Sequence, residues 1–380
     1  MQFNFIVRAV VVIAFATVGY GCSPAGKSAA LLVELNGTHA DFGVAALAGA
    51  QLAAARGDVK AVTSQKTFVP ITLVQGDIAN SPTAVAQQLQ PECIVGIGCN
   101  DSDTALAVVP TFTRAGKPFM IIGASDPKLP NQCGRNVFMA CFGDDAQAHA
   151  AALYAGKTFG KRAVLVFDSK LDYTRGLSRY FADFFTKLRG SIVARIDLRD
   201  ADAGANIAAL ATKDGVDFVY LATDPSSFEI ALALIRAVLP TTPIMGGDGL
   251  DCSYLDLAPA HLTDRVYFTT HAWFGMGATP EALAFAQAYT NAYGTPPPNG
   301  FAALGYDATM MVQMAMNTAG ESAITTPADV AKAIGKIQGY RGASGTISYT
   351  DGPVPRKDVW ILRMNKGRRG LATRIPSGDL

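Results

Sequence analysis

The sequence predicts an α/β protein of two similar lobes, each a parallel β-sheet flanked by helices. Short apolar runs alternate almost without a break with segments that carry apolar residues at helical spacing, which is the pattern of repeated βα units. About ten such strands precede residue 270, more than one compact doubly wound sheet holds comfortably. A chain of 380 residues is also long enough to form two hydrophobic cores.

The elements follow in order from this periodicity. The predicted strands cover residues 30–35, 69–74, 94–98, 118–122, 136–140, 162–167, 191–196, 217–221, 243–245 and 265–269, with two late strands at 346–349 and 358–364. The predicted helices cover residues 42–56, 83–90, 103–115, 145–159, 175–188, 205–212, 227–239, 280–293 and 300–318. Because the alternation ends in two long helices and then returns to strands, we expect the chain to cross between the lobes more than once.

The N-terminus has the features of an export signal. Arg8 precedes an apolar stretch that is too short to span a bilayer and ends in small residues before Cys22. This ending resembles the lipobox of bacterial lipoproteins, although Gly19 stands where that motif usually has Leu. We expect residues 1–21 to be a lipoprotein signal peptide, Cys22 to be lipidated and residues 22–29 to be a tether, which gives a lipid-anchored protein of the periplasm or cell envelope. Cleavage by the ordinary signal peptidase is the alternative.

The charge balance argues against a nucleic-acid binder. The chain has 32 Lys and Arg against 31 Asp and Glu, whereas a protein that binds duplex nucleic acid needs a concentrated basic face. Removal of residues 1–21 takes away only Arg8 and leaves the mature chain neutral. The basic residues at 366–369 are expected to lie in a solvated C-terminal tail.

The cysteines beyond Cys22 are odd in number, which leaves at least one free thiol in an exported protein. No C-x-x-C spacing occurs. Cys93 and Cys99 flank a predicted strand and lie about 20 Å apart, beyond the reach of a disulfide. The first pairing to test is Cys93 with Cys133, which are expected at the same end of nearby strands.

The motifs of the common enzyme classes are missing from the sequence. No G-x-S-x-G elbow occurs, and the histidines show no zinc-like spacing. A dinucleotide fingerprint begins at Gly96, but it has Asp101 in place of the third glycine and follows the wrong strand. We therefore expect no catalytic activity, cofactor or metal site. His271 follows a predicted strand and is interpreted as a packed or surface histidine, with a position in the hinge or cleft beside Trp273 as the alternative.

Polar residues follow the predicted strands, where an open parallel sheet binds its ligands. In the first lobe Ser102 is expected to cap a helix and Ser125 follows the next strand, so hydroxyl and N–H groups there suit an anion. In the second lobe Tyr173, Asp224 and Asp248 follow successive strands. Any one of these residues is more often a turn or cap residue than a ligand contact. Their joint placement predicts a cleft for a small solute with one anionic and one cationic end.

At these positions the sequence resembles the type I periplasmic solute-binding proteins of branched-chain amino acid transporters, the leucine/isoleucine/valine-binding family. The resemblance runs from about residue 30 to 364. Its marks are DFG at 41–43, GD at 76–77, SDTALA at 102–107, GASDP at 123–127, GGDGL at 246–250, FAALGYDA at 301–308 and GTI at 345–347. Each mark is weak alone, but their order and spacing are specific.

The resemblance implies two Rossmann-like lobes joined by three hinge crossings. Residues 30–142 plus 273–343 would form the N-terminal lobe, residues 143–272 plus 344–368 the C-terminal lobe, and residues 369–380 a tail. It also implies that Ser102, Ala124 and Ser125 hold the carboxylate of an amino acid, that Asp248 holds its ammonium, and that Phe42 and Tyr173 line the pocket. The partners would be this small molecule and the membrane permease of an ABC importer.

Several residues depart from the family pattern or leave alternatives open. Asp248 is shorter than the Glu that is common at this position. Trp273 is expected either to form one wall of the side-chain pocket or to pack in the hinge. Acidic residues are unusually numerous at the strand ends and favour a ligand with more positive charge than leucine; they are Asp101, Asp103, Asp172, Asp224 and Asp251. The alternative function keeps the fold and makes the chain an envelope lipoprotein that serves as a sensor or docks a protein partner without transport.

Overall fold

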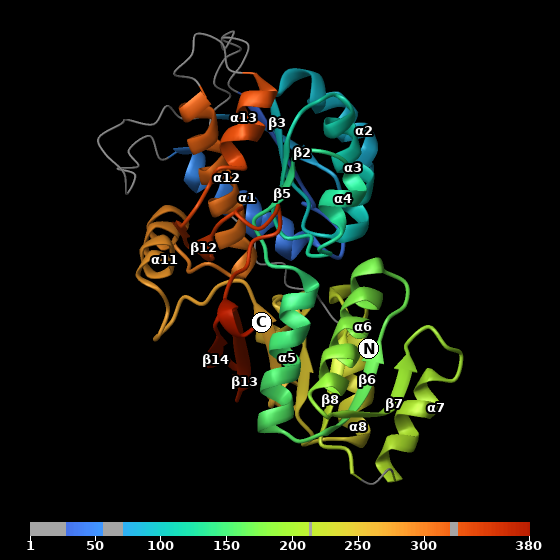
Figure 1. The fold of residues 1–380 in the computed structure, drawn as a ribbon. Coiled ribbons are helices and arrows are strands. Elements are labelled where there is room, and N and C mark those ends of the chain that lie inside the picture. The colour runs from blue at the N-terminus through green and yellow to red at the C-terminus, as the bar shows by residue number, and fades with distance from the viewer. Residues whose placement is uncertain (1–27, 56–70, 213–214, 320–325) are drawn as a thin grey trace, which may run out of the picture.

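The computed structural model describes residues 28–55, 71–212, 215–319 and 326–380. The expected signal peptide, Cys22 and most of the expected tether lie outside these residues. Two lobes, each with its own layered arrangement of helices and sheet, lie one above the other and are joined through the middle of the molecule (Figure 1). In the described parts of the chain no helix has both the length and the apolar character that crossing a membrane requires.

The first lobe is built on a parallel sheet with the strand order β2-β1-β3-β4-β5. Its strands are β1 (Ser28–Val33), β2 (Thr72–Asp77), β3 (Val95–Gly98), β4 (Phe119–Ile121) and β5 (Val137–Met139). Its early helices are α1 (Ala40–Ala55), α2 (Pro82–Leu89), α3 (Ser102–Arg114) and α4 (Leu129–Cys133). The central strands β1 and β3 are buried along almost their whole length, because helices cover both faces of a parallel sheet.

Later segments of the chain complete this first lobe. They are α11 (Pro280–Tyr293), α12 (Gly300–Ala319), α13 (Pro327–Ile334) and the hairpin β11 (Tyr340–Gly342) and β12 (Gly345–Ile347). The backbones of α1 and α12 approach closely, because a Cβ at Gly49 would lie 1.9 Å from the carbonyl oxygen of Ala302, and one at Gly305 2.1 Å from that of Ala46. Two helices far apart in the sequence therefore form one layer, as Figure 1 shows.

The second lobe contains the sheet β14-β13-β10-β9-β8-β6-β7. The parallel strands are β6 (Arg162–Phe167), β7 (Ser191–Asp197), β8 (Phe218–Ala222), β9 (Ile244–Gly246) and β10 (Val266–Thr270). The antiparallel strands are β13 (Val359–Asn365) and β14 (Arg368–Ile375). The helices are α5 (Asp144–Thr158), α6 (Asp172–Lys187), α7 (Ala203–Ala208), α8 (Pro225–Val238), α9 (Tyr254–Leu257) and α10 (Ala260–Thr263).

The two sheets share one strand order, and this order predicts where a ligand-binding cleft lies. The first five strands of each lobe run in the spatial order 2-1-3-4-5, so the connections reverse direction between β1 and β3 in the first lobe and between β6 and β8 in the second. Such a reversal leaves a crevice at the carboxyl ends of the two strands, where ligands bind in open α/β sheets. The segments that follow these strands are therefore the expected lining of the cleft.

Within the described residues, three segments join the lobes: one between β5 and α5, one between β10 and α11, and one between β12 and β13. Side chains tie the three together. The Nζ of Lys357 donates to the carbonyl oxygen of Ala140 at 2.9 Å, and the ring of His271 lies 3.9 Å from the ring of Phe142. Lys357 is almost fully buried, and burial lowers its pKa to about 8.

Two expected boundaries differ from the structure. Residue 344 was placed in the second lobe, but Ser344 belongs to the turn of the β11–β12 hairpin and donates to Asp307 of α12, so the last crossing comes later. Residues 369–380 were expected to be a tail, but β14 is the edge strand of the second sheet. Arg369, assigned to the solvated basic cluster, instead forms ion pairs with Asp251 and Asp256.

The cysteines of the described residues are all free and buried. The expected pair of Cys93 and Cys133 is not formed, and the Sγ of Cys133 points to the carbonyl oxygen of Ala105 in α3. Burial raises the pKa of both thiols to about 11. These cysteines therefore act as small apolar core residues.

Candidate functional site

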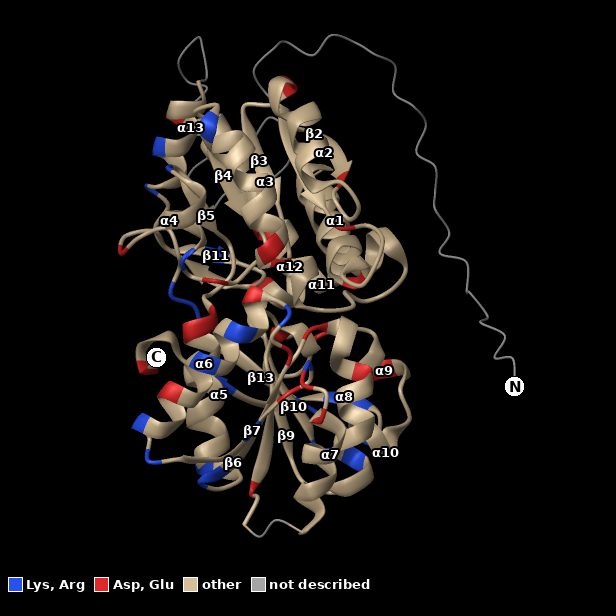
Figure 2. Ribbon diagram, turned by 90° about the vertical axis from the view of Figure 1, so that its right-hand side faces the viewer, with Lys and Arg blue, Asp and Glu red and all other residues tan. Residues whose placement is uncertain are grey.

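A cleft lies at the junction of the lobes, at the carboxyl ends of the strands on either side of both reversal points. Acidic residues lie on both sides of this junction (Figure 2). The cleft is lined by His39, Phe42, Asn100, Asp101, Ser102, Gly123, Ser125, Tyr173, Asp224, Asp248, Gly249 and Phe301. Among the described residues, no group of three or more His, Cys, Asp or Glu is arranged to hold a metal ion.

The first wall is the beginning of α3. Asp101 caps this helix by accepting from the N–H of Thr104 at 2.8 Å, so Asp101 and not the expected Ser102 is the N-cap. Ser102 is the first helical residue, is buried and lines the cleft. Just before it, Cys99 has a left-handed backbone with φ of 63°, an unusual conformation that reverses the chain between β3 and α3. The positive end of the helix dipole therefore faces the cleft.

The loop after β4 carries the second hydroxyl group. Ser125 donates to Oδ1 of Asp144 at 2.8 Å, and the side-chain amide of Gln147 donates to the same oxygen at 2.8 Å. Burial and the charge of Asp248 raise the pKa of Asp144 well above its usual range. Because Asp144 and Gln147 belong to α5, these contacts connect the first lobe to the start of the second.

Asp248, just after β9, is surrounded by hydrogen-bond donors. Its Oδ1 accepts from the hydroxyl of Tyr173 and from Gln147, each at 2.8 Å, and its Oδ2 lies 2.8 Å from Nε2 of His271. Burial alone raises the pKa of Asp248, but the hydrogen bonds, together with the charge interaction with His271, outweigh burial and leave the pKa lowered. Burial lowers the pKa of His271, and the hydrogen bond and charge of Asp248 oppose this shift. Asp248 therefore keeps its negative charge in a buried position.

Asp224, at the end of β8, is held differently. It caps α8 by accepting from the N–H of Ser226 at 3.1 Å, and its Oδ2 lies 2.9 Å from Nε2 of His39 in the first lobe. Burial alone lowers the pKa of His39, but the hydrogen bond to Asp224 and the nearby carboxylates outweigh burial and leave it raised. The pair is therefore a charge-assisted contact that spans the cleft.

Two stacked rings form an apolar wall. Phe42 of α1 and Phe301 of α12 lie with ring centroids 4.2 Å apart. Gly123 allows Phe301 to reach this position, because a Cβ at residue 123 would lie 2.5 Å from the Phe301 ring. The cleft thus combines one apolar wall with polar groups from both lobes, the usual design of a small-molecule site.

The lobes are closed over this cleft. Besides the His39–Asp224 pair, the N–H of Asp172 donates to Asp103 at 3.1 Å, and the N–H of Ser253 donates to Asp41 at 3.0 Å. The remaining free volume of the cleft is about 20 Å³, which is room for about one water molecule. Any solute must therefore enter through a separation of the lobes, as in hinged two-lobe proteins.

Most of the residues predicted to form the site come together in this cleft. Six of them line it: Phe42, Ser102, Ser125, Tyr173, Asp224 and Asp248. Ala124 lies behind the wall, where its N–H donates to the carbonyl oxygen of Cys99 at 3.2 Å. Trp273 lies in the hinge segment, and its Nε1 donates to the carbonyl oxygen of Met276 at 2.9 Å, which favours the hinge-packing interpretation.

Sequence reasoning did not assign a role to His39, Asn100, Gln147 or Phe301. Asn100 is the second residue after β3, so the strand-end rule could have identified it. His39 and Phe301 precede or begin helices, and Gln147 lies within one; their positions follow only from the packing of the lobes. His271 was interpreted as packed, and it is fully buried, but it also supports Asp248.

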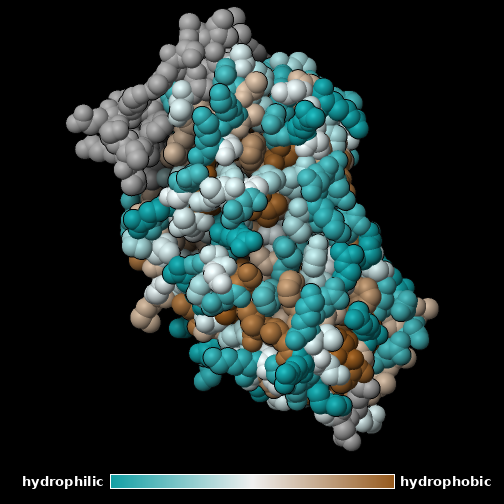
Figure 3. Space-filling model, viewed as in Figure 1, coloured by the Kyte–Doolittle hydropathy of each residue, from teal (hydrophilic) through white to brown (hydrophobic). Residues whose placement is uncertain are grey.

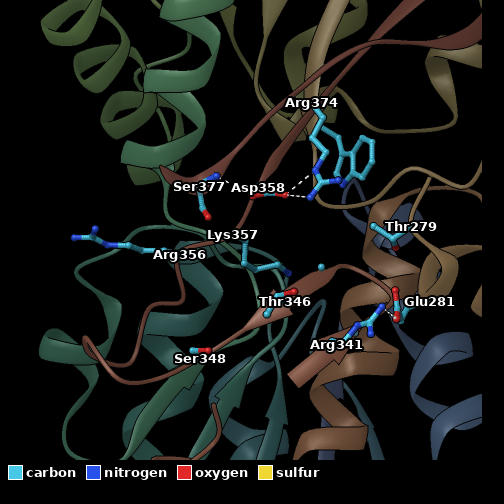
Figure 4. A pocket seen from close by; sticks show the side chains of 13 residues that line it. Thr279, Glu281, Arg341, Thr346, Ser348, Arg356, Lys357, Asp358, Arg374 and Ser377 are labelled. Atoms are coloured by element: carbon cyan, nitrogen blue, oxygen red, sulfur yellow. Dashed lines mark hydrogen bonds and ion pairs between the residues drawn. The ribbon is translucent and has the colours of Figure 1, made fainter. Parts of the chain in front are cut away.

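A larger cavity of about 230 Å³ lies at the hinge and away from the strand ends (Figure 4). Two ion pairs lie in its lining, Arg341 with Glu281 and Arg374 with Asp358, and Arg356 and Lys357 line it as well. Figure 4 shows these two pairs on different walls, with Lys357 between them. The cleft at the strand ends remains the better candidate for ligand binding, because open α/β sheets bind their ligands at the carboxyl ends of the strands.

Comparison with known proteins agrees with this arrangement. A family model described as "Periplasmic binding protein" matches residues 28–369. The Leu/Ile/Val-binding protein BraC3 of Rhizobium johnstonii is 23% identical over 319 residues, which cover 81% of this chain and 85% of that protein. The match thus extends through both lobes.

Solved structures share the fold. The leucine-binding protein LivK from Thermotoga maritima has a TM-score of 0.81 and 26% sequence identity, covering 93% of this chain and 99% of that one. LivJ, the substrate-binding protein of a branched-chain amino acid transporter from Streptococcus pneumoniae, was solved in complex with isoleucine. It has a TM-score of 0.79 and 23% identity, covering 92% of this chain and 99% of that one.

Proposed function

The chain belongs to the periplasmic binding protein family, and from that premise we propose that it is the solute-binding subunit of an ABC importer. The solute would be an amino acid or a related amine-bearing compound, captured outside the cytoplasm and delivered to a membrane permease. The observation that carries this proposal is the pairing of opposite polar groups in one cleft. The first lobe supplies a helix N-terminus and hydroxyl groups, and the second supplies the charged carboxylate of Asp248.

In this proposal the solute first docks on one lobe of the open form. Its carboxylate lies at Ser102 and Ser125, near the start of α3, and its ammonium lies at Asp248. Rotation about the three crossing segments then brings the second lobe over it. Closure follows ligand binding only if the ligand binds the closed state more tightly. The contacts of Asp248 act in a water-excluded space, where charge-assisted hydrogen bonds are strong.

The relatives favour solute capture over docking of an envelope partner. BraC3 is named for binding leucine, isoleucine and valine, LivK for binding leucine, and LivJ for its place in a transporter. The described surface seen in Figure 3 is largely hydrophilic, with hydrophobic residues in small separate patches. A partner-docking face is typically a broader apolar patch than these.

The proposal is tested by identifying what the protein carries through purification. Mass spectrometry of the solute released from the mature chain should detect an amine-bearing compound, and a thermal-shift panel should give the same class of ligand. Amino acids, amines and small carboxylates belong in the panel. A panel in which only aromatic or other amine-free carboxylates stabilise the protein would contradict the proposed function.

We also propose that Cys22 carries the lipid anchor. This proposal is supported by the lipobox-like residues that precede it. The substitution Cys22→Ser should move the protein from the membrane fraction to the soluble extracytoplasmic fraction, because one acyl-bearing residue would be lost. Ser28→Ala, outside the lipobox-like sequence, is the matched control and should leave the distribution unchanged. Membrane association that persists in Cys22→Ser would contradict the anchor.

A further inference from the structure

The cleft contains two separate acidic centres. The Asp248 centre consists of Asp248, Tyr173, Gln147 and His271. The Asp224 centre consists of Asp224, Asp101, Asn100 and His39. The charge of Asp248 acts on Asp144 and Tyr173, whereas His39 interacts electrostatically with Asp101 and Asp224. One α-ammonium group satisfies the first centre and leaves the second to another part of the solute.

Asn100 shows what the Asp224 centre requires. Its backbone N–H donates to Oε1 of Glu34 at 3.3 Å, and its side-chain Nδ2 donates to Oε2 at 2.9 Å. These bonds orient the amide, and its Oδ1 is buried without a hydrogen-bond partner. Asn100 itself is only 6% exposed and lines the cleft. A buried carbonyl oxygen without a hydrogen-bond donor has an unfavourable free energy. A donor group on the solute would satisfy this atom.

The charges of the residues that line the cleft also favour a cationic group on the solute. Among the described residues that line the cleft there are three aspartates and neither Lys nor Arg. His39 is the one lining side chain that can carry positive charge, and its Nε2 lies 2.9 Å from Asp224. In the closed cleft, the imidazolium of His39 occupies the place beside Asp224 that a cation on the solute would take.

We propose that the solute is an α-amino acid whose side chain ends in a second cationic group, an ammonium or a guanidinium. Its α-ammonium binds Asp248, its carboxylate lies between Ser102 and Ser125, and its side-chain cation binds Asp224 and donates to Oδ1 of Asn100. The stacked rings of Phe42 and Phe301 pack against the aliphatic part of the side chain. This inference rests on the proposed function and specifies the class of its substrate.

The test compares two ligands that differ by one group. L-lysine and L-norleucine share a four-carbon side chain, and only lysine ends in an ammonium. Isothermal titration of the mature chain, washed free of bound solute, should give L-lysine or L-arginine at least about tenfold higher affinity than L-norleucine, because a charge-assisted contact in a closed cleft is added.

Asp224→Asn should reduce this preference to about threefold or less, because the neutral amide can still cap α8 but offers no charge to the side-chain cation. Asp183→Asn on the exposed face of α6 is the matched control and should keep the preference. The ratio in the unmodified protein decides the question even if Asp224→Asn does not fold.

Three outcomes are informative. A clear preference for the basic amino acids supports the inference. Equal or tighter binding of norleucine or leucine would contradict the inference that the solute has a basic side chain. It would leave the proposed binding of amino acids unaffected. Failure of every amino acid and every amine to bind, while the protein keeps its folded circular dichroism spectrum, overturns the proposed function itself and the inference with it.

Discussion

Asp248 and Asp224 occupy equivalent places at the ends of neighbouring strands of the second sheet, yet the protein holds them in different ways. Both are nearly buried and both have lowered pKa values. The donors to Asp248 come from α5, α6 and the segment after β10. The partner of Asp224 across the cleft, His39, comes from the other lobe. Asp248 is thus organised without closure, whereas the His39 contact of Asp224 exists only when the lobes meet.

This difference suggests that the two carboxylates have different roles in ligand binding. A preorganised anchor loses little entropy on binding and gives affinity for a group that every ligand of the class shares. A carboxylate whose surroundings are completed only on closure gives higher affinity to a ligand that stabilises the closed state. We therefore expect Asp248 to set overall affinity and Asp224 to set selectivity and closure.

The largest expected effect is from Asp248→Ala. The substitution leaves a ligand ammonium without its partner in a buried position and also removes the acceptor of Tyr173, Gln147 and His271. Affinity for every amino acid that binds should fall by about 3 kcal/mol or more, roughly 100-fold. Isothermal titration measures this change, with Asp183→Asn as control. Unchanged affinity would contradict the role of Asp248 as anchor.

A smaller effect, on stability, is expected from Gln147→Leu. Gln147 is fully buried, donates to Asp144 and Asp248, and accepts from Thr269 at 2.6 Å. Its loss should lower the free energy of unfolding by about 2–4 kcal/mol because several buried polar groups lose partners at once.

Chemical denaturation measures the Gln147→Leu effect. Gln51→Leu on an exposed position of α1 is the matched control and should change stability by less than about 0.5 kcal/mol. Equal effects of the two substitutions would mean that Gln147 does not organise the Asp248 centre.

The smallest effect, about 1 kcal/mol, is expected from the contact of His39 with Asp224. The pKa of His39 is raised in the folded protein. The stabilisation is therefore complete below the ordinary histidine pKa of about 6.5 and is lost as the pH rises through the folded value. The stability difference between the unmodified protein and His39→Gln should be largest near pH 5.5 and should shrink toward pH 8.5.

Thermal unfolding across this pH range measures the difference. His261→Gln, at an exposed position, is the control. Ionisation of Glu34 and Asp144, whose pKa values are raised, occurs in all three proteins and largely cancels in the comparison. A stability difference that does not vary with pH would show that the His39–Asp224 contact is not an ion pair.

The sequence was sufficient for the parts of the fold that depend on local pattern. Repeated βα units predicted both parallel sheets, and the rule that ligands bind at strand ends identified Ser102, Ser125, Asp224 and Asp248 before any contact was known. The N–H of Ala124, whose contact with the ligand was implied by the family resemblance, donates within the first lobe. Strand ends indicate where a residue lies but not what its backbone groups already bind.

Long-range features could not be read in this way. The strand β14 is an edge strand that begins with two arginines, so it resembled a solvated tail. The ion pairs of Arg369 join residues more than 100 positions apart in the chain. The cleft positions of His39 and Phe301 depend on how α1 and α12 pack and how the lobes meet. Periodicity carries no information about these distances.

The most direct test of the different roles of Asp248 and Asp224 is a crystal structure of the mature protein with the amino acid that binds best. We predict that the α-ammonium lies within hydrogen-bond distance of Asp248, that the carboxylate lies at Ser102 and Ser125, and that His39 is displaced from Asp224 by the side chain. A ligand in the hinge cavity, or one that makes no contact with Asp248, would contradict the account.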